Sequence, residues 1–138
     1  MKRSNFLRKA LVFCCLVLIP VTIIESCSKQ TTTNPANVNF TLDLTSSANA
    51  SLKTIGGYLV TKGVIVIRSS STVYNAFSAT CTYAPCTLEY VIATDLIYCP
   101  CHSCTYDPTT GSVLSGPPPA ALAKYTVTQA GNILTVKS

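Results

Sequence analysis

Five of the chain's eight cysteines and its only histidine lie within residues 81–104, at spacings that suit metal binding or disulfide formation. Residues 81–86 read Cys-Thr-Tyr-Ala-Pro-Cys, and residues 99–104 read Cys-Pro-Cys-His-Ser-Cys. A hairpin-like segment separates the two motifs, so we expect two short cysteine loops at strand ends that face each other across a narrow gap. Thiolates and an imidazole in such a place suit a soft metal, a disulfide, or both.

Zinc is one candidate metal, because the two motifs supply a closed four-ligand set: Cys81, Cys99, His102 and either Cys101 or Cys104. A nucleophilic Cys–His pair is not expected, since His102 has no orienting acid nearby in the sequence. We therefore expect a binding or carrier protein that is not an enzyme by itself.

The segments that must position these loops have the pattern of short β-strands. Residues 38–44 alternate apolar and polar side chains with a period of two, as in a half-buried strand. No stretch after Cys27 keeps apolar residues at helical spacing for three turns. The sequence predicts an all-β domain, a small antiparallel sandwich or barrel, with further strands at residues 58–61, 64–67, 73–77, 88–93, 96–98, 125–128 and 133–136.

Turn residues divide this series of strands. Lys62-Gly63 separates two β-branched runs and indicates a tight turn. Asn75 and the Gly131-Asn132 pair are read as bends or hairpin tips.

The charge distribution excludes a nucleic-acid-binding surface. The chain has 138 residues, a formal net charge of +5 and only 11% charged residues. Four of the basic residues precede residue 10, and from Cys27 onward six basic and four acidic side chains are spread without a cluster. We therefore expect no nucleic-acid partner.

The N-terminal segment has the pattern of a lipoprotein signal peptide over residues 1–26. Four basic residues precede an apolar run at residues 10–24, which is shorter than a membrane-spanning helix requires. The following Ile-Glu-Ser-Cys resembles the bacterial lipobox, so Cys27 is the expected lipidated N-terminus of the mature protein. A polar tether at residues 27–37 would then hold a domain at residues 38–138 on a membrane of the bacterial cell envelope, facing the periplasm or the outside.

The two cysteine motifs and the residues after them resemble the Rieske iron–sulfur family. Residues 99–102 match its Cys-Pro-Cys-His box, and Cys81, Thr82 and Cys86 match its other box. The aromatic-Asp pair Tyr106-Asp107 and the Ser-Gly-Pro loop at residues 115–119 match the segment that covers the cluster in the family. The resemblance implies a Rieske-type domain with cluster-binding loops at residues 81–86 and 99–107.

The family's roles carry over to matching positions of this chain. Cys81 and Cys99 would be thiolate ligands of one iron of a [2Fe–2S] cluster, and His102 would bind the other iron. Cys86 and Cys101 would form the disulfide that ties the loops together. Tyr106 would place its hydroxyl near the cluster.

Three positions depart from the family pattern. Tyr83 stands where the second histidine ligand belongs, Ser103 where the box has glycine, and Cys104 where a serine donates to a bridging sulfide. The iron bound by His102 must then take a phenolate, a thiolate such as Cys104, or water as its remaining ligand. An anionic replacement adds negative charge and should lower the potential from the Rieske range towards about −400 mV.

Together these observations predict a membrane-anchored Rieske-type electron-transfer lipoprotein with an unknown redox partner protein. The alternative is a cluster-free Rieske-fold lipoprotein, in which Tyr83 packs over the loop and the domain serves as a structural or partner-binding module.

Overall fold

The computed structural model describes residues 35–138. The predicted signal peptide, the lipidated Cys27 and most of the predicted tether lie outside the described residues. The elements are β1 Asn39–Asp43, the 3-10 helix η1 Ser47–Lys53, β2 Tyr58–Thr61, β3 Val64–Arg68, β4 Tyr74–Ser78, β5 Glu89–Val91, β6 Leu96–Cys99, β7 Cys104–Tyr106, β8 Val113–Ser115, β9 Lys124–Ala130 and β10 Ile133–Lys137.

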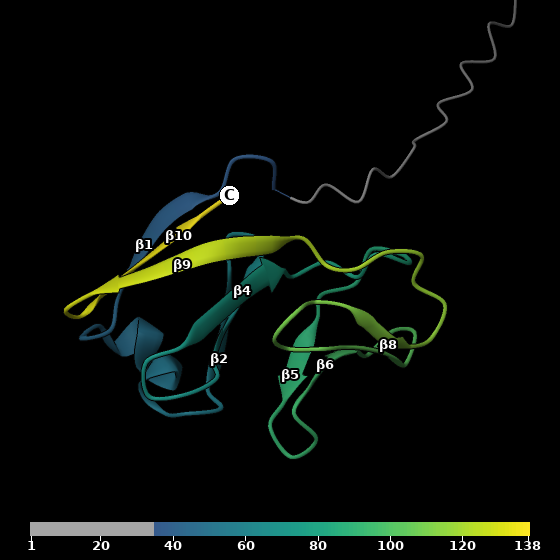
Figure 1. Cartoon of the computed structure of the whole chain (residues 1–138), viewed down its shortest axis with the longest axis horizontal. Helices are drawn as coiled ribbons and strands as arrows, with labels where there is room; N and C mark the ends of the chain where they lie inside the picture. Colours follow the sequence, from purple (N-terminus) through teal and green to yellow (C-terminus); the bar gives the residue numbers. More distant parts are fainter. Residues whose placement is uncertain (1–34) are drawn as a thin grey trace, which may run out of the picture.

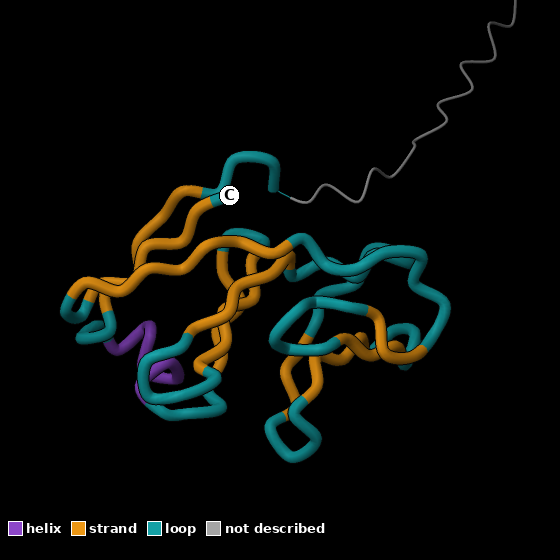
Figure 2. The backbone as a smooth tube through the Cα atoms, in the orientation of Figure 1, coloured by secondary structure: helices purple, strands orange, loops and turns teal. Residues whose placement is uncertain are grey.

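The strands form two antiparallel sheets, which confirms the all-β prediction. The larger sheet has the order β1-β10-β9-β4-β3-β2, and the smaller has the order β5-β6-β7-β8. Figure 1 shows the small sheet as a separate lobe beside the larger one, reached through the chain between β4 and β5 and left through the chain between β8 and β9. In Figure 2 the loops of this lobe gather at the end away from the β5–β6 turn.

Strand β3 contributes to two hydrophobic cores, because both of its faces are buried. Val64 and Val66 pack in a core formed with β1, β10 and η1. Ile65 and Ile67 pack instead against the small sheet. A strand buried on both faces has a continuous apolar run in place of an alternating one, and the Val-Ile-Val-Ile sequence of β3 is such a run.

Two predicted turns are confirmed, and one prediction is wrong. Lys62 and Gly63 both have positive φ between β2 and β3, as a two-residue hairpin turn requires, and Gly131-Asn132 joins β9 to β10. Asn75 does not lie in a bend; it is a buried residue of β4. Its side-chain amide donates a hydrogen bond to Ser69 Oγ at 2.9 Å, which satisfies the buried polar group inside the strand.

Three elements were not predicted from the sequence. These are η1, β7 and β8, of which β7 occupies part of the expected loop at residues 99–107. Strands β7 and β8 have three residues each and pair with a register shift at Thr105/Tyr106, so neither shows a clear period of two. Within residues 35–138, no helix has the length and apolar character needed to cross a membrane.

Candidate metal centre

Two cysteine loops at the end of the small sheet form the candidate site. The first follows β4 and is closed by a hydrogen bond from the Cys81 N–H to the Cys86 carbonyl at 2.9 Å. The second joins β6 to β7 and is closed by the Ser103 N–H, which donates to the Cys99 carbonyl at 2.9 Å. The second turn lies at the end of the β6–β7 pair, where Cys99 and Cys104 are partners.

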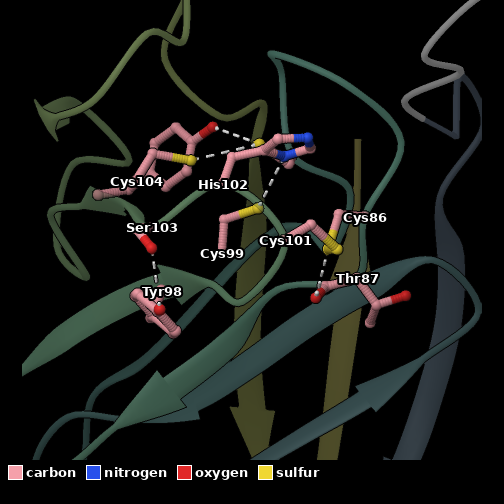
Figure 3. The surroundings of a disulfide bond; sticks show 10 residues. Cys86, Thr87, Tyr98, Cys99, Cys101, His102, Ser103 and Cys104 are labelled. Carbon is pink, nitrogen blue, oxygen red and sulfur yellow. Dashed lines mark hydrogen bonds between the residues drawn. A yellow bond between two sulfur atoms is a disulfide. The ribbon is translucent and has the colours of Figure 1, made fainter.

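A disulfide between Cys86 and Cys101 joins the two loops across a sequence separation of 15. This is the pair that the Rieske resemblance implied. The bond lies to one side of the remaining sulfur atoms in Figure 3, so it ties the loops together and leaves Cys81, Cys99 and Cys104 as free thiols.

Cys81, Cys99 and His102 form a compact cluster, which we call the Cys/His group. Their sulfur and nitrogen atoms all lie within 4.8 Å of one another. The Cys99 Sγ atom lies 3.5 Å from His102 Nδ1, and both cysteines are fully buried while the imidazole is half-buried. The structure therefore brings together the three residues that the sequence proposed as metal ligands, with thiols inside and the imidazole towards the surface.

Tyr106 supports the Cys81 thiol from within the core. Its hydroxyl lies 3.3 Å from Cys81 Sγ, and the Thr82 N–H donates to the same hydroxyl oxygen at 3.2 Å. Burial opposes ionisation of the Cys81 thiol. The hydrogen bond from Tyr106, aided by the backbone N–H groups of Tyr83 and Ala84, outweighs burial and lowers the pKa of Cys81 to about 6. The surroundings of Cys81 favour its thiolate, which is the metal-binding form.

Cys104 also contacts Cys81, and the Ser-Gly-Pro loop at residues 115–119, called the Gly-Pro loop below, packs against it. The two sulfur atoms are 3.5 Å apart, and Cys104 is fully buried. Burial, followed by the neighbouring thiols of Cys81 and Cys99, raises the pKa of Cys104 to about 12. A Cβ atom on Gly116 would lie 2.5 Å from the Cys104 Cβ, so the loop approaches Cys104 as closely as a residue without a side chain allows.

Tyr83 occupies the outer side of the site. Its side chain is 52% exposed, and its ring meets the His102 ring edge-on with centroids 5.0 Å apart. The position that carries a second imidazole in the family pattern thus carries an aromatic ring packed on the first imidazole. No other histidine exists in the chain to replace it.

The remaining departure, Ser103, has φ of +52° in the turn of the second loop. Glycine adopts this left-handed conformation without the steric penalty that a side chain brings. The glycine of the family pattern is therefore explained by backbone geometry, and Ser103 adopts the same turn at a cost.

A clamp between the first loop and Ala120, the residue just after the Gly-Pro loop, was not predicted. The Thr82 hydroxyl donates to the Ala120 carbonyl at 2.7 Å, and it also lies 3.2 Å from the Tyr106 hydroxyl. The only sequence signal was the threonine beside Cys81 in the matched motif. Its partner, a backbone carbonyl 38 residues away, leaves no trace in the sequence.

The fold consists of two antiparallel sheets, and its disulfide-linked loops carry the Cys/His group. These features define a small all-β metal-binding domain. A family model described as "Rieske [2Fe-2S] domain" matches residues 41–126. The chain belongs to the Rieske family.

Curated relatives agree over part of the chain. It is 39% identical over 62 residues to the cytochrome b6-f complex iron-sulfur subunit of Chlorobaculum thiosulfatiphilum, covering 45% of this chain and 33% of the relative. It is also 39% identical over 64 residues to the subunit of that name from Chlorobaculum tepidum, covering 46% and 34%. The chain thus spans about a third of the length of these relatives.

A solved structure agrees over more of the chain. The cyanobacterial plasma membrane Rieske protein PetC3 of Synechocystis PCC 6803 has 30% sequence identity and a TM-score of 0.55, with 74% of this chain and 98% of that chain covered. The related proteins are described as an iron–sulfur subunit and as a Rieske protein. The present chain is accordingly a Rieske-type iron–sulfur domain.

The family implies a [2Fe–2S] cluster, and the donor atoms fit it in part. The Cys/His group supplies two thiols and one imidazole, which are three of the four protein donors of a Rieske centre. Tyr106 stabilises one of the thiolates. The donor set differs from that of the family at the fourth position, because Tyr83 offers a phenol where the family has an imidazole.

Proposed function

We propose that this chain is a lipid-anchored [2Fe–2S] electron carrier of the bacterial cell envelope, with Cys81 and Cys99 binding one iron and His102 the other. The observation that carries this proposal is the Cys/His group, whose three donor atoms converge within 4.8 Å at the tip of the small sheet. The cluster, when bound, supplies a one-electron redox centre.

The residues of the chain hold this centre and separate it from water. Both proposed thiolate ligands are fully buried, and the Tyr106 hydroxyl stabilises negative charge on Cys81. His102 and Tyr83 lie on the outer side, where the imidazole is half-buried and Tyr83 is 52% exposed. We infer that a redox partner docks on this side, because electrons leave a buried centre most readily where the covering layer is thinnest.

The anchoring part of the proposal rests on the sequence before residue 35. The basic start, the apolar run and the Ile-Glu-Ser-Cys order support cleavage before Cys27 and lipid attachment to it. The Synechocystis relative is described as a plasma membrane protein. Cys27→Ala should release the domain from the membrane fraction or leave an uncleaved precursor, and mass spectrometry of the mature N-terminus checks this directly. A mature N-terminus at another residue contradicts the anchor.

One observation favours a second candidate, a Rieske-fold module without a cluster. Tyr83 packs by its ring on His102, which is how an aromatic side chain would cover a loop that binds no metal. In this case the disulfide alone holds the two loops together.

Anaerobic reconstitution with iron and sulfide separates the two candidates. The full-length chain should bind two irons and two sulfides and give the electron spin resonance signal of a reduced [2Fe–2S] cluster. Cys99→Ser should lose the cluster, because it removes a proposed ligand. The matched control is Tyr98→Phe, the loss of one oxygen atom at the neighbouring residue of β6, whose hydroxyl lies 3.4 Å from Ser103 Oγ on the exposed side; it should keep the cluster. Absence of iron and sulfide in the wild-type chain would reject the electron-carrier proposal.

A further inference from the structure

Three free thiols meet beside the single imidazole, although the proposed cluster uses only two of them. Cys81, Cys99 and Cys104 are each fully buried and unoxidised. Cys104 contacts both of the others: it lies 3.5 Å from Cys81 by sulfur atoms, and it is paired with Cys99 across β6 and β7. Residues paired in register project to the same face of a sheet, so both sulfur atoms face Cys81.

We propose that Cys104 joins the Cys/His group as a third thiolate, and that the site thereby binds a single tetrahedral Zn²⁺ ion when no cluster is present. This inference goes beyond the electron-carrier function and does not depend on it. It assigns a metal-binding role to Cys104, which stands at a serine position of the family pattern.

The spacing of the donor atoms matches the edges of a small tetrahedron. With Zn–S bonds of about 2.3 Å and Zn–N bonds of about 2.0–2.1 Å, tetrahedral geometry places neighbouring sulfurs about 3.8 Å apart and sulfur and nitrogen about 3.5 Å apart. The sulfurs of Cys81 and Cys104 are 3.5 Å apart, and Cys99 Sγ is 3.5 Å from His102 Nδ1. The widest separation within the Cys/His group is no more than 4.8 Å, and Cys104 adds its sulfur at 3.5 Å from Cys81. Side-chain rotations would bring these four donor atoms to tetrahedral spacing.

The surroundings keep the Cys104 sulfur near the site. The close approach of Gly116 packs the Gly-Pro loop against the Cys104 Cβ and Cα atoms. The Thr82 hydroxyl ties the first cysteine loop to Ala120 of the same covering segment. Figure 3 shows the side chains of Cys99, His102 and Cys104 directed towards a common region, with the Cys86–Cys101 bond to one side.

The other side chains of the two loops are poor alternatives as a fourth donor. Cys101 was an equal candidate from the sequence, but its sulfur is bonded to Cys86. Tyr83 would offer an oxygen, whereas closed zinc sites are built from thiolate and imidazole donors. The Tyr83 side chain is also 52% exposed, with its ring against His102, whereas the three thiols are fully buried.

The test is anaerobic metal titration of the cluster-free full-length chain in detergent, with the Cys86–Cys101 bond intact, Co²⁺ as a spectroscopic probe and Zn²⁺ in competition with a chromophoric chelator. Wild type should bind one ion with the visible bands of tetrahedral Co²⁺ and a charge-transfer intensity for three thiolates. Cys104→Ser should lose about a third of that intensity and at least tenfold in Zn²⁺ affinity, in line with removal of one ligand. Tyr83→Phe is the matched control and should bind both ions as the wild type does.

Two results would overturn the inference: equal Co²⁺ spectra and Zn²⁺ affinities in wild type and Cys104→Ser, or a loss of binding in Tyr83→Phe as large as that in Cys104→Ser. The first result would mean that Cys104 only fills space in the core. Iron and sulfide counts on the same variants distinguish this outcome from a failure of the proposed function. Cluster uptake tests the electron carrier, whereas the Cys104 dependence of Zn²⁺ binding tests the tetrahedral site.

Discussion

The disulfide between Cys86 and Cys101 should be a major source of stability for the domain, and replacing both cysteines with serine measures its contribution. The bond spans a sequence separation of 15. In the chain-entropy description, a loop of this length restricts the unfolded chain enough to contribute about 3 kcal/mol at 25 °C. Small domains have total stabilities of about 5–15 kcal/mol, so the double variant should fold but be clearly less stable.

Urea unfolding followed by circular dichroism gives the free energy of unfolding of each variant. With a urea dependence of about 1–3 kcal/mol per molar, typical of a small domain, the midpoint should fall by about 1–3 M. Cys86→Ser and Cys101→Ser should each lose nearly as much as the double variant, because either change breaks the same bond. Wild type treated with a phosphine reductant should shift to the same midpoint.

Two outcomes would refute this reasoning. A loss below about 1 kcal/mol would show that the unfolded chain is already restricted without the bond, or that the bond strains the folded loops. Single losses that add up to the double loss would show that the two side chains act separately, and that their effect comes from packing and not from the covalent link.

The other predictions concern the residues around the site. Tyr83→His should raise cluster occupancy and shift the redox potential upward from about −400 mV towards the two-histidine range, measured by iron counting and redox titration; an unchanged potential contradicts it. Gly116→Ala should destabilise the domain by about 1–3 kcal/mol in urea unfolding, because its φ of +98° is strained for a side chain and the new Cβ meets Cys104. Ser103→Gly should stabilise the domain by about 0.5–1 kcal/mol, since it relieves the left-handed strain, and a loss of stability would count against that explanation. Hydrogen bonds from the backbone N–H groups of Thr110 and Thr109 lower the pKa of Asp107 below its ordinary value of 3.8. Its stabilising effect is thus present above that value and lost as pH falls through the lowered pKa, so the stability difference between wild type and Asp107→Asn should shrink in acid.

Local patterns in the sequence predicted most of the strands, but they did not predict which strands contribute to each of the two hydrophobic cores. The Val-Ile-Val-Ile run of β3 predicts a strand by its β-branched residues, yet nothing in it shows that its two faces belong to different cores. Asn75 was read as a bend because asparagine favours turns, and the Ser69 hydroxyl that satisfies it inside β4 depends on tertiary structure. Strands of three residues, such as β7, are too short to show a period.

The candidate site was predicted from two sources, the spacing of the cysteines and the resemblance to the Rieske family. The spacing of the cysteines indicated only a metal site or a disulfide, and the family resemblance distinguished the Cys86–Cys101 pair from the proposed ligands. The sequence offered Cys104 only as one of several candidate ligands, because its contact with Cys81 joins residues that are 23 positions apart. The position of Tyr83 on the exposed side of His102 also required the structure.

Strand β3 is buried on both faces, so it couples the packing of the large sheet to the packing of the small sheet. A side chain exchanged at Ile65 or Ile67 disturbs the packing under the cysteine loops, and a change at Val64 or Val66 moves the same backbone from the opposite face. The amide hydrogens of this strand should therefore exchange with solvent only when the entire domain unfolds. A closely packed interior has low compressibility, so a shift of side chains on one face of β3 is transmitted to the other face. We therefore expect no flexible hinge between the two sheets. When the exposed tip meets another protein, adjustment of fit must come from the loops around His102, while the sheets behind them move as one piece.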